Sequence, residues 1–300
     1  MRRTKCTVNV FERRRTKYQV LFGQHAILRN NAQCGNLASL SRYSRFLFII
    51  MSTNANSTLI QRLFNAGAHF GFKKSRRHPT VVPYLFTTKE GIDIFDLEKT
   101  AVSLDEVKEV LKNAGLNGKT VLFVGTKDEA TKTVKRIAEE LEAPYVVNRW
   151  IGGILTNLPE IKKRLNRLEA LTHESASGEL ERKYTKKERV MLGREMDKLT
   201  FNFGGVAKMQ KAPDYLLVVD PRHDHIAVTE AISKNVPIIA IMSSDCDAAR
   251  IDYPVVVNDS LQTSVALVLE ELAAALKEGM TAYVPKPVVA REPLARRPRA

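Results

Sequence analysis

Residues 213–241, PDYLLVVDPRHDHIAVTEAISKNVPIIAI, contain the pattern that decides the fold. The runs YLLVV and VPIIAI are apolar throughout, and the DHIAVTEAISKN segment between them is typical of a helix. A strand without polar alternation is typical of a sheet covered on both faces, and a helix is the usual connection between two parallel strands. This stretch therefore predicts a strand–helix–strand unit of a parallel sheet.

The same alternation extends in both directions from this unit. We expect strands at 120–125, 145–147 and 253–257, with helices at 97–115, 127–142 and 261–279 between or after them. Gly115 is expected to end the first of these helices. Two short β runs around a KEG turn are predicted at 84–96, after a first amphipathic helix capped by Ser57. The fold class is therefore α/β, a doubly wound and mainly parallel sheet of the flavodoxin or Rossmann-like kind.

Residues 159–204 interrupt the alternation. Apolar residues form one narrow stripe from Ile161 to Leu171 and a second from Leu192 to Phe203, with a polar connector between them. This pattern predicts an inserted antiparallel helical hairpin resembling a coiled coil. Residues 161–200 carry eleven basic and seven acidic side chains, a net charge of +4. Such charges are often only a solvated helix surface, but their concentration in one arm favours a polyanionic partner.

Composition narrows the class of protein. The 300 residues carry a net charge of +14, and 44% of them are hydrophobic, which is enough for a folded core. The longest apolar runs are far shorter than the roughly 20 residues that cross a bilayer. Three cysteines, Cys6, Cys34 and Cys246, form neither a disulfide framework nor a paired metal motif, so a reducing compartment is expected.

The first fifty residues carry ten of the basic residues and one acid, Glu12. Three interpretations stay open: an organellar transit peptide, a basic arm for nucleic acid, or translation that starts at Met51, which we favour. The domains expected are a basic extension (1–56), an α/β domain (57–158 and 205–279), the inserted hairpin (159–204) and a Pro/Arg-rich tail (280–300). We expect both ends of the chain to be disordered.

Motifs for catalysis are weak. GLNGKT at 115–120 lacks the spacing of a phosphate-binding loop, and VGTKDEA at 124–130 has one glycine, although its helix end could hold an anion. A nucleotide-binding Rossmann-like protein is therefore the alternative hypothesis. Acidic and histidine residues at 220–225 and 245–247 could hold a cation, but such residues commonly cap helices. We expect no catalytic residue, no cofactor and no metal.

The stretch NRWIGGILTN at 148–157 contains the chain's only tryptophan. Arg149 can pair with a phosphate, and Gly152 and Gly153 permit a tight turn. Trp150 either packs beneath the sheet or stacks on a base, and both alternatives suit a loop at a domain boundary.

Four segments together resemble one family. LFNAGAHFGF (63–72), FVGTK (123–127), NRWIGGILTN (148–157) and residues 213–241 resemble the successive motifs of the universal small ribosomal subunit protein two family, from about Ser57 to Glu278. The hairpin is similar to that of the bacterial and organellar type. The chain departs from the family pattern at Phe72, where histidine is usual, at Asp128, often basic, and at Ser243, often aspartate.

The resemblance implies a structural, non-enzymatic ribonucleoprotein component that binds small-subunit ribosomal RNA and neighbouring ribosomal proteins, and that supports docking of ribosomal protein one. It implies a role in translation on cytoplasmic ribosomes, or in an organelle if residues 1–50 are a transit peptide, with no membrane and no small-molecule substrate. A protein-docking platform with little RNA contact is a further alternative. By this resemblance, Gly67, His69, Phe70 and Gly71 shape the RNA-facing surface together with Gly152, Gly153 and Thr156. The RNA-binding residues expected are Lys73, Lys74, Arg76, Arg77, Arg149, Trp150, Asn157, Lys162, Lys163, Arg167, Lys186 and Lys187.

Overall fold

The computed structural model describes residues 58–207, 209 and 211–283. The interpretations made for residues 1–57, including the start at Met51 and the cap at Ser57, lie outside this part of the chain, as does most of the 280–300 tail. Among the described helices, none is both long and apolar enough to cross a membrane.

Five strands form the central sheet, in the order β5-β4-β6-β7-β8, and every neighbouring pair is parallel. The strands are β4 (Val121–Val124), β5 (Tyr145–Val146), β6 (Tyr215–Val219), β7 (Ile238–Met242) and β8 (Tyr253–Val256). The predicted parallel sheet is confirmed. The chain first adds β5 on one side of β4 and then β6, β7 and β8 on the other, so the strand order reverses direction between β4 and β6. In such sheets, ligands bind beyond the carboxyl ends of the strands at this switch point.

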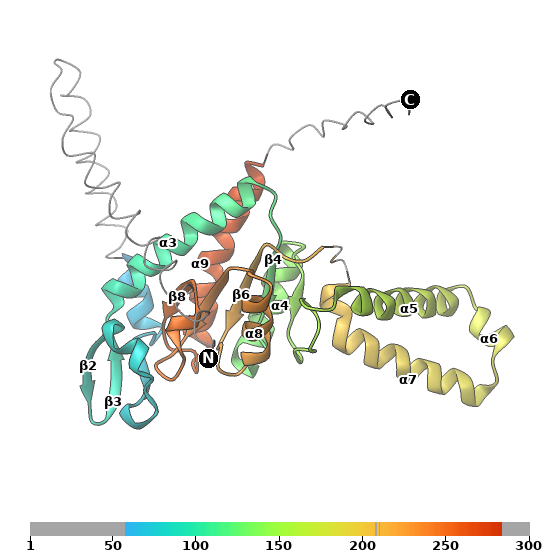
Figure 1. Ribbon diagram of the computed structural model, residues 1–300, viewed down its shortest axis with the longest axis horizontal. Helices are drawn as coiled ribbons and strands as arrows, with labels where there is room; N and C mark the ends of the chain where they lie inside the picture. The colour runs from blue at the N-terminus through green and yellow to red at the C-terminus, as the bar shows by residue number, and fades with distance from the viewer. Residues whose placement is uncertain (1–57, 208, 210, 284–300) are drawn as a thin grey trace, which may run out of the picture. The chain divides into compact units, whose positions relative to one another are not determined.

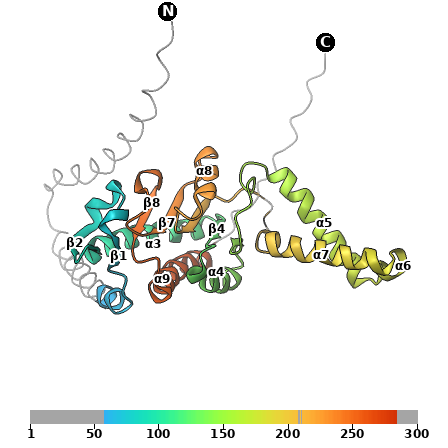
Figure 2. The same ribbon diagram turned by 90° about the horizontal axis from the view of Figure 1, so that it is seen from below.

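Helices cover both faces of this sheet (Figure 2). The side chains of Phe123 and Leu217 face a core built with α3 (Leu97–Leu116), α4 (Asp128–Glu140), α9 (Gln262–Thr281) and the helical residues 58–65. The side chains of Leu122 and Leu216 face a second core, with α8 (His225–Ser233) and the loop at 150–155. Strand residues thus alternate between two buried faces, which explains why the strands are apolar throughout.

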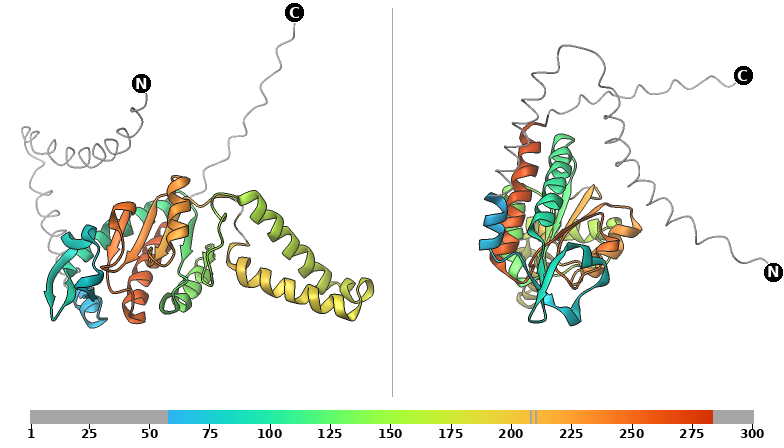
Figure 3. Two further views of the ribbon diagram at one scale, coloured as in Figure 1. Left: turned by 60° about the horizontal axis from the view of Figure 1, so that its bottom comes forward. Right: turned by 90° about the vertical axis from the view of Figure 1, so that its left-hand side faces the viewer.

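Helices α3 and α9 run side by side (Figure 3). A Cβ built on Gly115 would lie 2.7 Å from the backbone carbon of Gly279, and one on Gly279 would lie 2.3 Å from the carbonyl oxygen of Lys112. The expectation that Gly115 ends α3 is wrong. The helix continues to Leu116, and Gly115 is buried because the two backbones approach each other there.

A second, antiparallel sheet has the order β1-β3-β2 and comprises β1 (Phe70–Lys73), β2 (Leu85–Lys89) and β3 (Ile92–Phe95). The predicted turn between β2 and β3 is present, with Glu90 at φ 53° and Gly91 at φ 78°, the conformation that a tight two-residue hairpin requires. The sequence did not predict β1. Short 3-10 helices lie at Lys74–Arg76, Pro79–Tyr84, Gly204–Val206 and Ala248–Arg250.

Three helices lie between β5 and β6: α5 (Leu158–Ala176), α6 (Glu179–Lys183) and α7 (Lys186–Phe203). Helices α5 and α7 contact each other, and α6 lies at the end far from the sheet (Figure 1). The stripe on α5 is buried, whereas α7 buries only Phe203 fully. Gly178, at φ 71°, makes the turn before α6. That residues 159–204 form a domain of their own stays a prediction.

Candidate nucleic-acid interface

The loop NRWIGGILTN is organised by one carboxylate, that of Glu230 on α8. Its Oε1 accepts hydrogen bonds from the indole Nε1 of Trp150 at 3.1 Å and the backbone N–H of Gly153 at 2.8 Å. Its Oε2 accepts from the backbone N–H groups of Leu155 and Thr156, and from the Thr156 hydroxyl, at 3.1–3.2 Å. Burial by itself raises the pKa of Glu230, but these donors outweigh burial and hold the pKa below its ordinary value. We call this arrangement the Glu230 clamp.

The clamp decides between the two alternatives for Trp150. Its side chain is 5% exposed and packs in the core beneath the sheet, so the ring face is not available to stack on a base in this structure. Trp150 therefore anchors the loop. Its neighbour Arg149 is exposed, and so is Asn157, which precedes α5. The loop presents these two polar side chains to solvent.

The basic cluster at 73–77 divides into two kinds of residue. Lys73, Lys74 and Arg76 are exposed and form no ion pair with any residue in the described part of the chain. Arg77 differs, because its Nη1 lies 3.3 Å from Oδ1 of the buried Asp93. A cation that neutralises a buried carboxylate is tied to the fold, so three of the four predicted residues are free to reach a partner.

The cations predicted on the hairpin are all exposed, and two of them are paired within it. Lys163 lies 2.7 Å from Glu160, and Arg167 lies 3.6 Å from Glu195. Exposed pairs of this kind contribute little to stability and exchange readily with other anions. Lys162, Lys186 and Lys187 form no ion pair with a described residue. The described structure does not bring these cations together with the cluster at 73–77.

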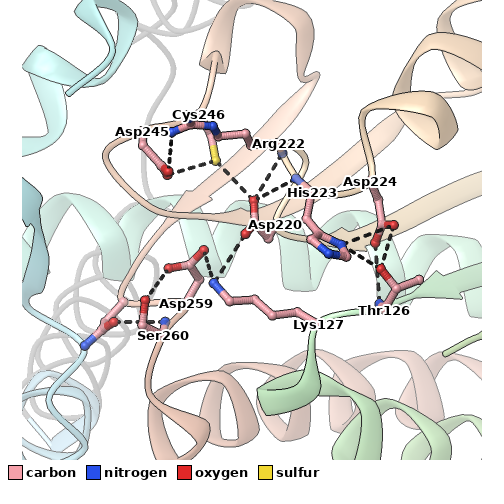
Figure 4. A network of polar contacts seen from close by, with 11 residues as sticks. Thr126, Lys127, Asp220, Arg222, His223, Asp224, Asp245, Cys246, Asp259 and Ser260 are labelled. Carbon is pink, nitrogen blue, oxygen red and sulfur yellow. Dashed lines mark hydrogen bonds and ion pairs between the residues drawn. The ribbon is translucent and has the colours of Figure 1, made fainter. Parts of the chain in front are cut away.

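A polar network fills the switch point at the carboxyl ends of β4, β6, β7 and β8 (Figure 4). Lys127 Nζ lies 3.3 Å from Asp220 Oδ2 and 3.0 Å from Asp259 Oδ2. Asp220 has φ 62°, and its Oδ1 accepts from the backbone N–H groups of Arg222 and His223 at 3.1–3.2 Å. These side-chain bonds stabilise a left-handed conformation that aspartate adopts more readily than most residues.

Electrostatics explain why Lys127 lies inside this network. Burial lowers the pKa of Lys127, but Asp259 and Asp220 outweigh burial and raise it above its ordinary value, so the ammonium group stays charged. Burial, with the nearby charge of Asp220, raises the pKa of Asp259 to about 6. Burial by itself raises the pKa of Asp220, but the ammonium group of Lys127 and the two backbone N–H groups that bond to Asp220 outweigh burial and lower this pKa. Lys127 is thus the counter-ion that lets two carboxylates share a buried site.

The same geometry disfavours the nucleotide hypothesis. The ammonium group that would bind a phosphate at VGTKDEA is already paired with two carboxylates, and Asp128 and Glu129 occupy the first turn of α4. These acids repel an anion from the helix end that would otherwise attract it. In residues 58–283, apart from the two undescribed positions, no group of three His, Cys, Asp or Glu side chains is arranged to hold a metal ion. Burial and nearby carboxylates raise the pKa of the Cys246 thiol, which makes it unreactive.

Sequence reasoning missed Glu230 and Asp259. A signal for Glu230 exists, because Ala227, Val228 and Ala231 are buried beside it on α8, and a glutamate on an apolar helix face needs a partner. Asp259 has the same signal as Asp220 and Asp245, because it follows a predicted apolar strand and so lies at the carboxyl end of the parallel sheet.

Comparisons with known proteins place this geometry in context. A family model described as "Ribosomal protein S2" matches residues 63–279. A protein of Wolinella succinogenes named "Small ribosomal subunit protein uS2" is 42% identical over 217 residues, which cover 72% of this chain and 80% of that protein. Proteins of the same name from Petrotoga mobilis and Nocardia farcinica are 42% identical over 220 and 223 residues, covering 73% and 74% of this chain and 76% and 78% of theirs. The matched range contains the Glu230 clamp, the network around Lys127 and the cluster at 73–77.

Proposed function

Because the chain belongs to the ribosomal protein S2 family, whose members are structural and non-enzymatic components of the cytoplasmic ribosome, we propose that it binds small-subunit ribosomal RNA through its exposed basic side chains. The observation that carries the proposal is the group of Lys73, Lys74 and Arg76, which are exposed and free of ion pairs to described residues. Phosphates of an RNA backbone are the natural counter-ions for such a group.

The remaining predicted residues take supporting roles in this proposal. Arg149 and Asn157 contact RNA from the loop that the Glu230 clamp holds, and the cations of α5 and α7 contact it along the hairpin. Arg77 and Trp150 act indirectly, because Arg77 pairs with Asp93 and Trp150 is buried. On the family resemblance, we also propose contacts with neighbouring ribosomal proteins, including ribosomal protein one.

A charge-reversal experiment tests the RNA contact. A tagged full-length chain carrying Lys73→Glu and Lys74→Glu is expressed, and its amount in gradient-purified small subunits is measured by quantitative mass spectrometry against the unmodified chain. We expect a clear loss of incorporation at low salt concentration, because each lost phosphate contact weakens binding. The difference from the unmodified chain should become smaller as the salt concentration rises, because a variant with fewer phosphate contacts depends less on salt.

The matched control is Lys132→Glu with Lys135→Glu on α4, which changes the net charge by the same amount elsewhere. Incorporation of this control should be close to that of the unmodified chain. Equal loss in both variants would mean that only total charge matters. Unchanged incorporation of the Lys73 and Lys74 variant would remove this cluster from the RNA contact.

A further inference from the structure

Three aromatic rings lie in contact where β1 begins. The rings of Phe64 and His69 are parallel to within 10°, with centroids 4.5 Å apart. The ring of Phe70 lies 4.0 Å from that of His69 and is tilted by 40°. The Phe64 side chain is 59% exposed and that of Phe70 49% exposed. We call these three residues the aromatic ledge.

A defined turn builds the ledge from residues that are close in sequence. The helical residues 58–65 end in a turn in which the N–H of Ala68 bonds to the carbonyl of Leu63, and that of Gly67 to the carbonyl of Phe64, both at 3.0 Å. This pair of bonds is a Schellman motif, and it requires the left-handed φ of 72° found at Gly67. Asn258 fixes the turn from the other side, since its Nδ2 donates to the carbonyl of Gly67 at 3.1 Å. The turn brings His69 back over Phe64.

The rings are exposed although the core is adjacent. Leu63 and Ala68 within the same turn are fully buried, so the chain directs apolar side chains inward here and still leaves two phenylalanines in solvent. Burial lowers the pKa of His69, which keeps its ring neutral near pH 7. The ledge is therefore an uncharged aromatic surface, with two parallel rings and a third tilted against them, held by a defined turn.

The charge around the ledge indicates what it binds. Residues 58–89 contain six basic side chains and no acidic one. Arg62 pairs with Glu271 and Arg77 with Asp93, whereas Lys73 lies in the same strand as Phe70, roughly 10 Å further along at about 3.3 Å per residue. Arg76 lies 6.0 Å from the centroid of the Phe72 ring, at the outer limit of a cation–π contact.

We propose that the aromatic ledge is a stacking platform for unpaired bases of an RNA strand whose phosphates lie along Lys73, Lys74 and Arg76. Aromatic faces beside a basic track are the combination by which proteins bind single-stranded nucleic acid. An apolar protein partner would cover the rings but would leave Lys73, Lys74 and Arg76, which form no ion pair with a described residue, without a counter-charge. The inference rests on the proposed function in taking RNA as the partner, and it adds that the bound strand is unpaired at this point.

The test compares two fluorescein-labelled probes of equal charge, an adenosine RNA dodecamer and an abasic ribose-phosphate dodecamer. Binding to the full-length chain is measured by fluorescence anisotropy at 0.15 M salt. The basic residues bind both probes, so the ratio of the two Kd values isolates stacking. We expect the adenosine probe to bind roughly ten-fold tighter or more.

The ledge variant carries Phe64→Leu and Phe70→Leu, and the matched control carries Phe201→Leu, an exposed phenylalanine on α7. In the ledge variant the Kd for the adenosine probe should rise while the Kd for the abasic probe stays the same, so that most of the difference between the two probes is lost. The control variant should keep the difference of the unmodified chain. Each single variant is measured in the same way, so a folding defect of the double variant does not remove the test.

Several results would overturn the platform. Equal affinity of the unmodified chain for both probes would do so, as would a ratio that survives in the ledge variant. A ledge variant that keeps the ratio but is lost from small subunits would identify the ledge as a protein-docking face. Recovery of the unmodified chain from purified small subunits tests the proposed function separately. If the unmodified chain is absent from small subunits but its ratio of Kd values for the two probes still depends on both phenylalanines, the ribosomal role is refuted and the stacking platform is supported.

Discussion

Replacing Glu230 with glutamine should destabilise the protein strongly although the side chain keeps its size. Each carboxylate oxygen accepts at least two hydrogen bonds, from Trp150 and Gly153 at Oε1 and from Leu155 and Thr156 at Oε2. In glutamine an NH2 group, which donates hydrogen bonds, replaces one of these two oxygens. In either orientation of the amide, at least two donors therefore lose their acceptor. A buried donor without a partner costs about 1–3 kcal/mol, which gives a loss of about 2–6 kcal/mol in the free energy of unfolding.

Urea unfolding at pH 7 measures this loss, with the fluorescence of Trp150 as the reporter, because it is the only tryptophan. Glu169→Gln on the exposed face of α5 is the matched control and should change stability by less than about 0.5 kcal/mol. A loss below about 1 kcal/mol for Glu230→Gln, with an unchanged urea slope, would refute the view that the clamp holds this loop.

The clamp also has a defined pH dependence. The pKa of Glu230 is lowered in the folded state, so its contribution to stability is fully present above the unfolded pKa of about 4.3 and is lost as pH falls through the folded pKa. The stability difference between the native protein and Glu230→Gln should therefore shrink below about pH 4. A difference that stays constant from pH 7 to pH 3 would show that charge plays no part.

Three other predictions concern separate features. Gly279→Ala should lower the free energy of unfolding by about 1–3 kcal/mol in urea titration, because its Cβ would meet the backbone of α3. Gly193→Ala, with no atom near its Cβ, should raise the free energy of unfolding by up to about 1 kcal/mol. Equal effects of the two changes would exclude close packing as the cause. Gly67→Ala should cost about 1–2 kcal/mol, since φ is 72° and the Cβ would lie 2.9 Å from a leucine side chain, and an unchanged urea midpoint would contradict this. Because the pKa of Asp259 is raised to about 6, this group contributes stability that is fully present below about pH 4 and is lost as pH rises through 6. The free energy of unfolding measured between pH 4 and 7 should therefore fall less steeply in Asp259→Asn than in the unmodified chain.

The parallel sheet could be predicted because its physical cause is local. A strand buried on both faces, such as β7, must be apolar at every position, and that pattern is visible in the sequence. Gly115 was misjudged because a glycine near a helix end fits two explanations, a terminus or a close approach of another backbone. Only the position of α9, more than 140 residues later in the chain, decides between them.

The candidate site was predictable in composition and not in pairing. That residues 73–77 form a basic cluster is evident from the sequence, but the ion pair that separates Arg77 from its neighbours depends on Asp93 in another strand. For Trp150, the sequence left packing and stacking equally open. The outcome depended on Glu230, whose carboxylate is the acceptor that the indole N–H requires when it is buried.

The Glu230 clamp has a consequence for the order in which the protein takes shape during synthesis. Its acceptor lies 74 to 80 positions after the donors it holds, and helices α5, α6 and α7 lie between them. A ribosome adds roughly 5–20 residues per second, so the loop at 150–156 waits several seconds after its own synthesis for its acceptor. The helices between them rely on local contacts and can form within that interval. The new chain therefore carries helices α5 to α7 before their attachment to the sheet is fixed, and α8 completes that attachment from the later part of the sequence.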